Sequence, residues 1–297
     1  MSILYIYNIY SWRCKVLKVE NLCKRYETFQ LKNVSFELPA GYIMGFIGIN
    51  GAGKSTTIKS ILNLVHPDSG SVTVLGKDMY RNEIELKQKI GFMLGPVDYY
   101  LRIRIARLAG VIGRFYNQWD ERQFFGYLEK FGIDPHKRIS ELSTGMRVKL
   151  GIAIALSHGA KLIILDEPTS GLDPLARDEL LELFQEIVAD GERSILFSTH
   201  ITSDLDKCAD YIIFIRNGEL VANDTKDDLI DQHAVVKGPL EALTPELEGR
   251  LEGFKRSKYG FSGLIRREKL QDSDAVQIEV PNLEDLMVYY NQEGAKS

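Results

Sequence analysis

The chain has 297 residues, of which 44% are hydrophobic, and a formal net charge of −4 at pH 7. This length predicts one large domain, or one domain with a small appendage, and the hydrophobic content is enough for a sizeable core. The slight negative charge gives no electrostatic reason to expect nucleic acid as a partner. The three cysteines cannot form a complete disulfide set and lack metal-ligand spacing, so we expect reduced cytosolic thiols at Cys14, Cys23 and Cys208.

The N-terminal residues 1–12 are apolar and aromatic but lack the basic start and the small-residue cleavage site of a secretory signal. Residues 16–22 have the pattern of a first β-strand, and bacterial genes sometimes begin at a codon that otherwise encodes valine. We therefore expect Val16 to be the true start and residues 1–15 to be a non-native extension. No apolar run approaches the roughly 18 to 20 residues that a helix needs to cross a bilayer, so we expect any membrane path on another polypeptide.

Short apolar segments alternate with helical patterns from residue 17 to a hairpin at Asn217-Gly218. We predict strands at residues 17–22, 31–38, 42–47, 71–75, 162–165 and 194–197. Helices are predicted within an insertion at residues 97–140 and at residues 55–64, 146–155 and 175–189. This alternation is typical of an α/β fold with a mostly parallel sheet that is covered on both faces. Beyond residue 225, a small module is predicted from strands at 234–237 and 276–280 and a helix at 283–290.

A glycine-rich turn after the third strand matches the phosphate-binding loop pattern, Gly48-Ile49-Asn50-Gly51-Ala52-Gly53-Lys54-Ser55. Glycines let the backbone turn tightly, so that N–H groups point at an anion, and the following helix presents its positive end to the same charge. Lys54 is expected to reach the β- and γ-phosphates of ATP, and Ser55 to supply an oxygen to Mg2+. The required context, a buried strand before and a helix after, disfavours the alternative of a glycine-rich turn with a solvated lysine. The residues expected to bind nucleotide here are Gly48, Asn50, Gly51, Ala52, Gly53, Lys54, Ser55 and Thr56.

Two acidic residues, Asp166 and Glu167, follow the apolar strand predicted at residues 162–165. In open parallel sheets, ligands bind beyond the carboxyl ends of strands, where the phosphate loop would also lie. Asp166 can then hold Mg2+, directly or through water, and Glu167 can accept a proton from, or orient, the water that attacks the γ-phosphate. Taken alone, the two acids are equally well explained as helix caps or turn residues.

Further motifs resemble, in order and spacing, those of the nucleotide-binding subunits of ABC transporters. Leu142-Ser143-Thr144-Gly145-Met146 looks like the signature motif of that family, Ser170-Gly171-Leu172-Asp173 like its D-loop, and Ser198-Thr199-His200 like its switch histidine. Tyr26 stands where the family places an aromatic ring on the adenine. Each match is weak alone, since a lone histidine after a strand is more often structural and a tyrosine near a first strand is usually core or surface. The resemblance covers about residues 17–219.

The resemblance implies an ABC cassette: an α/β P-loop NTPase fold with a RecA-like core, an antiparallel β subdomain and a helical insertion. It implies an ABC ATPase domain at residues 16–224, with the helical subdomain at about 97–143, and a C-terminal α+β accessory module at residues 225–297. The implied cofactors are ATP and Mg2+, and the implied catalytic residues are Lys54, Glu167 and His200. Ser143, Thr144 and Gly145 are expected to contact ATP bound to the opposite subunit of a dimer, and Asp173 of the D-loop is also expected to contact nucleotide.

Two positions depart from the family pattern. Gly95 stands where the family has a lid glutamine, whose amide contacts Mg2+ or the attacking water and reports the nucleotide state to the membrane partner. Water or Asp98 is left to fill that role, so the departure affects coupling more than ATP binding. In the signature, Thr144 and Met146 replace the commoner glycine and glutamine, while Ser143 and Gly145 are retained.

Within the family, the chain looks like ABC-2-type exporters of low-GC bacteria, which often export peptides, toxins or antimicrobials or give immunity to them. This implies an ATPase subunit in the cytoplasm, peripheral on the inner face of the cell membrane, with a separate transmembrane permease as its partner. The second cassette is either an identical copy or a paralogous subunit. Open alternatives are an importer subunit, a soluble ABC ATPase without a transport role, and a regulatory nucleotide sensor.

A basic stretch surrounds Tyr259-Gly260-Phe261 in the C-terminal module and contains Lys255, Arg256, Lys258, Arg266, Arg267 and Lys269. The plain interpretation is the solvated face of a strand. The alternative is a contact with the sister subunit or with an acidic regulator.

Overall fold

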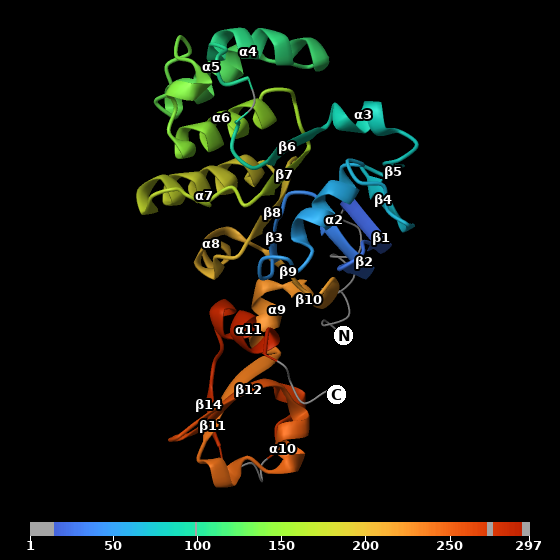
Figure 1. Ribbon diagram of the computed structural model, residues 1–297, viewed down its shortest axis with the longest axis vertical. Coiled ribbons are helices and arrows are strands. Elements are labelled where there is room, and N and C mark those ends of the chain that lie inside the picture. Colours follow the sequence, from blue (N-terminus) through green and yellow to red (C-terminus); the bar gives the residue numbers. More distant parts are fainter. Residues whose placement is uncertain (1–14, 99, 272–275, 293–297) are drawn as a thin grey trace, which may run out of the picture.

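The computed structural model describes residues 15–98, 100–271 and 276–292 of the chain. These residues form three parts along the long axis of the molecule: a helical part, a central part built on two sheets, and a C-terminal part built on a third sheet (Figure 1). The expected extension at residues 1–15 lies, apart from Lys15, outside the described residues, as does Cys14. Cys23 and Cys208 are free thiols, as predicted.

The central sheet has six strands in the order β10-β9-β3-β8-β7-β6. Five of them are parallel, and β10 pairs antiparallel with β9 in a hairpin. All residues of β3 and β8 are buried, as expected for inner strands of a sheet that is covered on both faces. The strands predicted at residues 42–47, 162–165 and 194–197 are confirmed, and β6 is a strand that the sequence patterns did not predict. The bounds are β3 Ile43–Ile47, β6 Ile90–Leu94, β7 Leu162–Asp166, β8 Ser194–Thr199, β9 Tyr211–Arg216 and β10 Glu219–Thr225.

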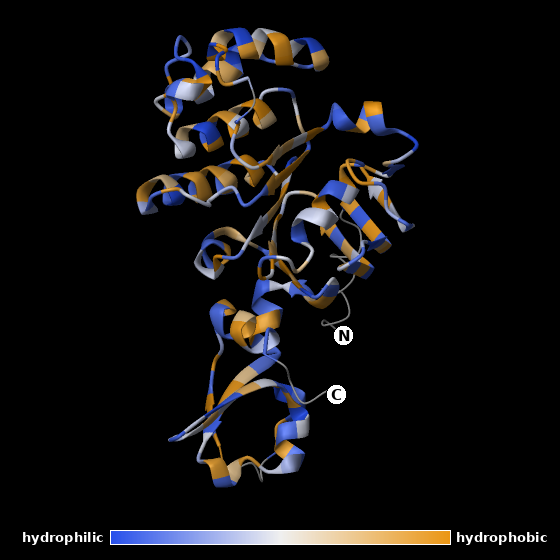
Figure 2. Cartoon of the chain, in the orientation of Figure 1, coloured by the Kyte–Doolittle hydropathy of each residue, from blue (hydrophilic) through white to orange (hydrophobic). Residues whose placement is uncertain are grey.

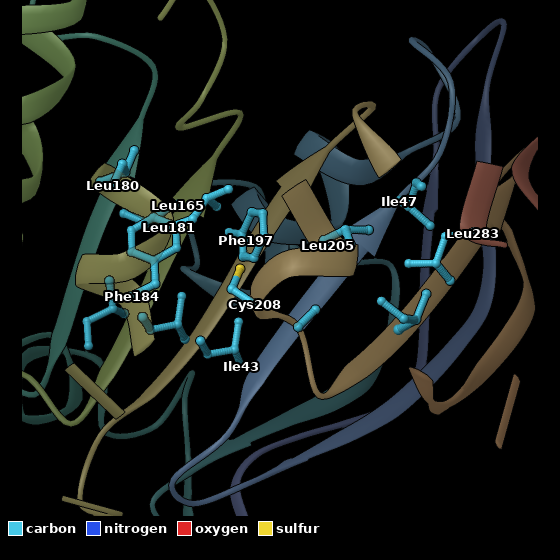
Figure 3. Close-up of a cluster of buried hydrophobic side chains, with 14 of the residues drawn as sticks. Ile43, Ile47, Leu165, Leu180, Leu181, Phe184, Phe197, Leu205, Cys208 and Leu283 are labelled. Atoms are coloured by element: carbon cyan, nitrogen blue, oxygen red, sulfur yellow. The ribbon is translucent and has the colours of Figure 1, made fainter. Parts of the chain in front are cut away.

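Alternate residues of β3 point to two hydrophobic clusters, one on each face of the central sheet. Met44 and Phe46 join the cluster that is covered by α2 and the second sheet. Ile43 and Ile47 join the cluster that α6, α7 and α8 cover (Figure 3). The prediction of a sheet covered on both faces is thus confirmed. The bounds are α2 Lys54–Ile61, α6 Thr144–Leu156, α7 Pro174–Val188 and α8 Thr202–Cys208.

The second sheet is antiparallel and has the order β2-β1-β4-β5. In β2, the residues Leu31, Val34, Phe36 and Leu38 are buried while most of their neighbours are exposed, which is the alternation of a half-buried strand. The antiparallel β subdomain that the family resemblance implied is therefore present. The bounds are β1 Lys15–Arg25, β2 Gln30–Pro39, β4 Ser69–Val74 and β5 Lys77–Asp78, and the short helix α3 spans Glu83–Lys87.

The helical part contains α4 (Ile105–Ile112) and α5 (Glu121–Lys130), which pack on α6 around a separate hydrophobic cluster. The predicted helical insertion is confirmed, although much of the segment forms loops. These helices carry both hydrophobic and hydrophilic residues (Figure 2). Among the described residues, no helix combines the length and the apolar character that a membrane span requires.

In its described residues, the C-terminal part is an antiparallel sheet of order β12-β13-β11-β14 with three α-helices and two 3-10 turns. The strand predicted at residues 234–237 and the helix at 283–290 are confirmed, and the strand predicted at 276–280 is shorter. Side chains of α11, Leu283 among them, join the same cluster as Leu205 and Cys208 of α8, so this part is packed against the cassette (Figure 3). The bounds are α9 Lys226–Asp231, β11 His233–Gly238, α10 Pro245–Arg250, β12 Leu251–Ser257, β13 Gly260–Arg266, β14 Gln277–Glu279 and α11 Leu283–Tyr290.

Candidate active site

The phosphate loop connects β3 to α2, and its glycines allow a tight turn. The backbone φ is 84° at Gly51 and 118° at Gly53, in the left-handed region that favours glycine. A Cβ atom at Gly48 would lie 2.6 Å from the carbonyl oxygen of Ile215, so a larger residue does not fit there. α2 begins directly after this turn and has no acidic residue in its first turn, so its positive end faces the loop uncompensated. The loop therefore has the geometry of an anion-binding site.

Lys54, the first residue of α2, is only 5% exposed. Its Nζ donates to the Gly48 carbonyl oxygen at 2.7 Å and lies 3.2 Å from Glu167 Oε1. A buried ammonium is tolerated only when it is paired, and these two oxygens pair it at the loop. The other residues expected to bind nucleotide occupy the same turn, with Asn50 and Gly51 exposed, Ala52 and Gly53 buried, and Ser55 and Thr56 half-buried.

The two acids after β7 are fixed by the neighbouring strand β8. Ser198 Oγ donates to Asp166 Oδ1 at 2.5 Å and accepts from the Glu167 backbone N–H at 3.0 Å. Glu167 has a φ of 51°, a strained conformation for a non-glycine residue that persists where the surroundings hold it. Its carboxylate lies between Lys54 Nζ and His200, whose Nδ1 is 2.8 Å from Glu167 Oε2. The structure thus brings the three expected catalytic residues into contact.

This arrangement can orient a water molecule with the Glu167 carboxylate while Lys54 and His200 stabilise negative charge nearby. Ser55 and Asp166 are hard oxygen donors of the kind that Mg2+ prefers. Mg2+ is usually bound through one or two protein oxygens, with water and phosphate oxygens completing its shell, so this small donor set fits it. The described part of the chain has no cluster of three or more His, Cys, Asp or Glu side chains that could hold a metal ion by itself.

The signature and D-loop residues form a second surface. Ser143 caps α6, since its Oγ accepts from the Met146 N–H at 3.3 Å, and Asp173 caps α7 by accepting from the Ala176 N–H at 3.0 Å. The Ala176 N–H also holds the pKa of the exposed Asp173 carboxyl below its usual value.

Thr144 and Gly145 lie against the D-loop. A Cβ atom at Gly171 would be 3.7 Å from Thr144 Cγ2, and one at Gly145 would be 2.9 Å from Leu172 Cδ2. No hydrogen bond or ion pair within residues 15–98, 100–271 and 276–292 links the start of α6 to Lys54, Glu167 or His200. The site residues therefore fall into two groups on one chain.

Two expected positions lie at the margins of the site. Tyr26 follows β1 and is 44% exposed, so much of the residue is open to solvent, and Lys24 Nζ lies over its ring, 5.9 Å from the centroid. Gly95 follows β6 with a φ of 97°, and Asp98 is exposed. The lid position is thus occupied by a glycine in the left-handed region, which a residue with a side chain rarely adopts.

Sequence reasoning assigned no role to two features near the site. One is Ser198, which holds both acids and could have been found by aligning the ends of the two predicted parallel strands. The other is Asp204, a buried carboxylate next to Thr169 and Arg177, and burial raises its pKa above the usual value. A carboxylate on a short helix gives no sequence signal of burial.

Known proteins resemble this chain in sequence and in fold. A family model described as "ABC transporter" matches residues 31–170. The ABC transporter ATP-binding protein YxlF of Bacillus subtilis, itself uncharacterised, is 30% identical over 262 residues, which are 86% of this chain and 85% of that protein. The lantibiotic transport ATP-binding protein SrtF of Streptococcus pyogenes is 35% identical over 69% of this chain and 89% of its own length.

Among solved structures, an ATP-binding subunit of an ABC transporter matches with a TM-score of 0.67 and 31% identity, covering 73% of this chain and 92% of that one. Together, the fold, the site geometry and these similarities show that the chain belongs to the ATP-binding subunits of ABC transporters, a family of ATPases that couple ATP hydrolysis to transport.

Proposed function

We propose that Mg2+-ATP binds on the phosphate loop and is hydrolysed by the group formed by Lys54, Glu167 and His200. The observation that carries this proposal is the Glu167 carboxylate, held 3.2 Å from Lys54 Nζ and 2.8 Å from His200 Nδ1. Three elements that are distant in sequence, α2, β7 and β8, bring these side chains to the carboxyl-end edge of one parallel sheet, where ligands of such sheets bind.

Each residue has a separate task. The N–H groups of residues 48–55 and the positive end of α2 bind the phosphates, and Lys54 moves its donors from Gly48 and Glu167 to phosphate oxygens. Glu167, released from Lys54, orients or deprotonates the attacking water, and His200 fixes the Glu167 carboxylate and the γ-phosphate. Ser55 and Asp166 would hold Mg2+, which supplies charge neutralisation for the phosphates.

The exposed signature surface supports the proposal of a second subunit. Ser143, Thr144 and Asp173 are exposed and separated from the Lys54 group, and they lie at the N-termini of two helices, which favour anions. We infer that they complete the ATP site of a second copy or of a paralogous subunit. ATP closes such a pair because it binds the closed dimer more tightly than the open one.

We further propose an ABC cassette at residues 16–224 and an accessory module at 225–297, acting at the inner face of the cell membrane with a separate transmembrane permease. The lantibiotic transport relative supports an exporter of peptides or antimicrobials; an importer subunit and a soluble regulatory ATPase are the alternatives. Isolation of native complexes from membranes decides between them. A co-purified membrane-spanning chain without a substrate-binding protein supports the exporter, and isolation of the chain alone argues against it.

The substitution Glu167→Gln tests the catalytic assignment. It keeps the shape of the side chain but removes its charge and one of its two acceptor oxygens, so we expect ATP hydrolysis to fall by about 100-fold or more while binding persists. Gel filtration with ATP should then show an accumulated dimer. Glu192→Gln is the control, because Glu192 pairs with Lys161 at the surface. A Glu167→Gln variant that hydrolyses ATP at the normal rate, or one that remains monomeric with ATP, contradicts the proposal.

A further inference from the structure

The hairpin turn between β9 and β10 forms the floor of the phosphate loop. Gly218 N–H donates to the Ala52 carbonyl oxygen at 2.9 Å. Ile215 lies against the loop as well, since Cβ atoms at Gly48 and Gly53 would be 2.6 Å from its carbonyl oxygen and 3.1 Å from its Cδ1. The conformation of the phosphate loop therefore depends on where this turn lies.

The turn has little freedom of its own. Asn217 and Gly218 have φ values of 49° and 80°, the left-handed pair of a tight hairpin turn. The Gly218 carbonyl oxygen accepts from the Lys32 N–H at 2.8 Å, and a Cβ atom at Gly218 would lie 1.9 Å from the Gln30 carbonyl oxygen. The turn is held against β2, so a shift of the turn is transmitted to the loop rather than absorbed locally.

Arg216, the residue before this turn, binds the end of α11 in the C-terminal part. Its Nη1 donates to the Tyr290 carbonyl oxygen at 2.5 Å and lies 3.3 Å from the Gln292 carbonyl oxygen. The last carbonyl groups of a helix have no partner within the helix and carry its negative end, so a guanidinium is well suited to bind them. One hairpin thus contacts the phosphate loop through Ile215 and Gly218 and the C-terminal helix through Arg216.

α11 is joined equally closely to the sheet of the C-terminal part. Tyr290 Oη lies 2.9 Å from His233 Nε2 of β11, and both side chains are buried. A Cβ atom at Gly253 of β12 would lie 2.1 Å from the Tyr289 carbonyl oxygen. α11 is in direct contact with this sheet and with Arg216. A displacement of the C-terminal part therefore reaches the phosphate loop through Arg216 and its neighbours Ile215 and Gly218.

We propose that Arg216 is a positioning residue for the phosphate loop, through which the C-terminal module sets the affinity of the cassette for Mg2+-ATP. The inference rests on the proposed assignment of the phosphate loop as the nucleotide site. Arg216 acts by pre-organising the loop and does not touch the reacting atoms, so its loss raises Kd and KM and leaves kcat at saturation unchanged. By reciprocity, bound nucleotide strengthens the attachment of α11.

The test compares Arg216→Met, Arg216→Lys and Arg256→Met in the full chain. Arg256 is the matched control, an arginine of the C-terminal module that pairs with Glu248 and does not contact the hairpin between β9 and β10 in the described residues. We expect Arg216→Met to raise the Kd for Mg2+-ATP about five- to tenfold, with kcat within about twofold, Arg216→Lys to recover part of the affinity, and Arg256→Met to bind normally. Hydrogen exchange of residues 283–290 should slow on adding Mg2+-ATP to the wild type but not to Arg216→Met.

Three outcomes overturn the inference: an unchanged Kd in folded Arg216→Met, an equal loss of affinity in Arg256→Met, or exchange in α11 that ignores nucleotide in the wild type. If Arg216→Met does not fold, Arg216→Lys still tests the inference. A Kd of Arg216→Lys equal to that of the wild type, together with hydrogen exchange in α11 equal to that of the wild type, contradicts the proposed contact. Lys54→Met separates this inference from the site assignment. If Lys54→Met binds ATP normally, the assignment of the nucleotide site is wrong. If Lys54→Met loses ATP binding while Arg216→Met binds ATP normally, only the positioning role of Arg216 is wrong.

Discussion

Replacing Lys54 by methionine separates the contribution of this side chain to nucleotide binding from its contribution to folding. Methionine has a similar length and no charge, so it fills the same space. The Lys54 side chain is only 6% exposed, and removing a paired buried charge removes its desolvation cost together with its attraction. Glu167 keeps His200 as a partner and is 25% exposed, so water can solvate it. The buried Gly48 carbonyl oxygen loses the Lys54 donor, so we expect the free energy of unfolding to fall by about 1–2 kcal/mol, which corresponds to a Tm shift below about 8 °C.

Nucleotide binding should respond much more strongly to the same substitution. A hydrogen bond from a charged donor contributes about 1.5–3 kcal/mol, and Lys54 has three donors available for phosphate oxygens. Losing one to two such bonds costs about 3 kcal/mol of binding free energy, or about a 100-fold increase in Kd. Repulsion between the triphosphate and Glu167, no longer neutralised by Lys54, acts in the same direction.

Titration with a fluorescent ATP analogue and thermal unfolding of the same samples measure the two effects. Lys161→Met is the control, because Lys161 forms an exposed pair with Glu192 and should alter neither quantity. A folded Lys54→Met variant with a Kd within about threefold of the wild type refutes the phosphate role. A Tm lower by 10 °C or more, an order-of-magnitude threshold, shows instead that the buried pair stabilises the fold, contrary to the reasoning above.

Three further predictions follow from the geometry. Introduced into the Glu167→Gln variant, Ser143→Ala should abolish ATP-dependent dimer formation in gel filtration while monomer ATP binding persists; loss of both contradicts the two-group site. Gly91→Ala should lower the Tm, because its Cβ would lie 2.2 Å from the Ala155 carbonyl oxygen, whereas Gly126→Ala in α5 meets open space and should raise stability by about 1 kcal/mol. Burial lowers the pKa of the His233 imidazole below its ordinary value of 6.5, so the unfolded chain takes up this proton at a higher pH than the folded chain does. The stability that neutral His233 contributes is therefore present above pH 6.5 and is lost as the pH falls. The Tm of His233→Gln should then fall less than that of the wild type between pH 7.5 and 5.5, and equal losses refute this.

The sequence predicted the parallel core well because its strands are short apolar runs between clear turn signals. Residues 42–47 and 162–165 are such runs, and both are strands of the central sheet. β6 escaped prediction because Gly91 interrupts its apolar run, and that glycine is explained only by the close approach of α6. The β12–β13 hairpin was likewise not predicted, because charged residues occupy the exposed end of β12, where alternation with buried residues stops.

The candidate site was predictable as residue types but not as contacts. Lys54 and Glu167 could be named from local patterns, since a glycine-rich turn and a strand ending in acids are both sequence signals. That these two side chains meet at 3.2 Å follows from the order of β3, β8 and β7 in the sheet, which pairs segments more than 100 residues apart. For the basic stretch of the C-terminal module, the sequence left open a solvated strand face and a contact with another protein. Arg256 pairs with Glu248 and Lys269 pairs with Glu252, which favours the solvated strand face for those residues.

The lid position shows that a side chain missing from a motif can reflect the backbone rather than a lost contact. Gly95 has a φ of 97°, and a glutamine in such a left-handed conformation costs about 1–2 kcal/mol. The family side chain is therefore disfavoured by the loop conformation itself. The core and the helical part are instead joined by direct packing, since a Cβ at Gly91 would lie 2.2 Å from the Ala155 carbonyl oxygen and one at Gly151 2.8 Å from Met93 Sδ. At Gly91 the backbone of β6 lies directly against the backbone of α6, and at Gly151 α6 lies against the Met93 side chain of β6, so we expect a movement of α6 to displace the strand that leads to Gly95.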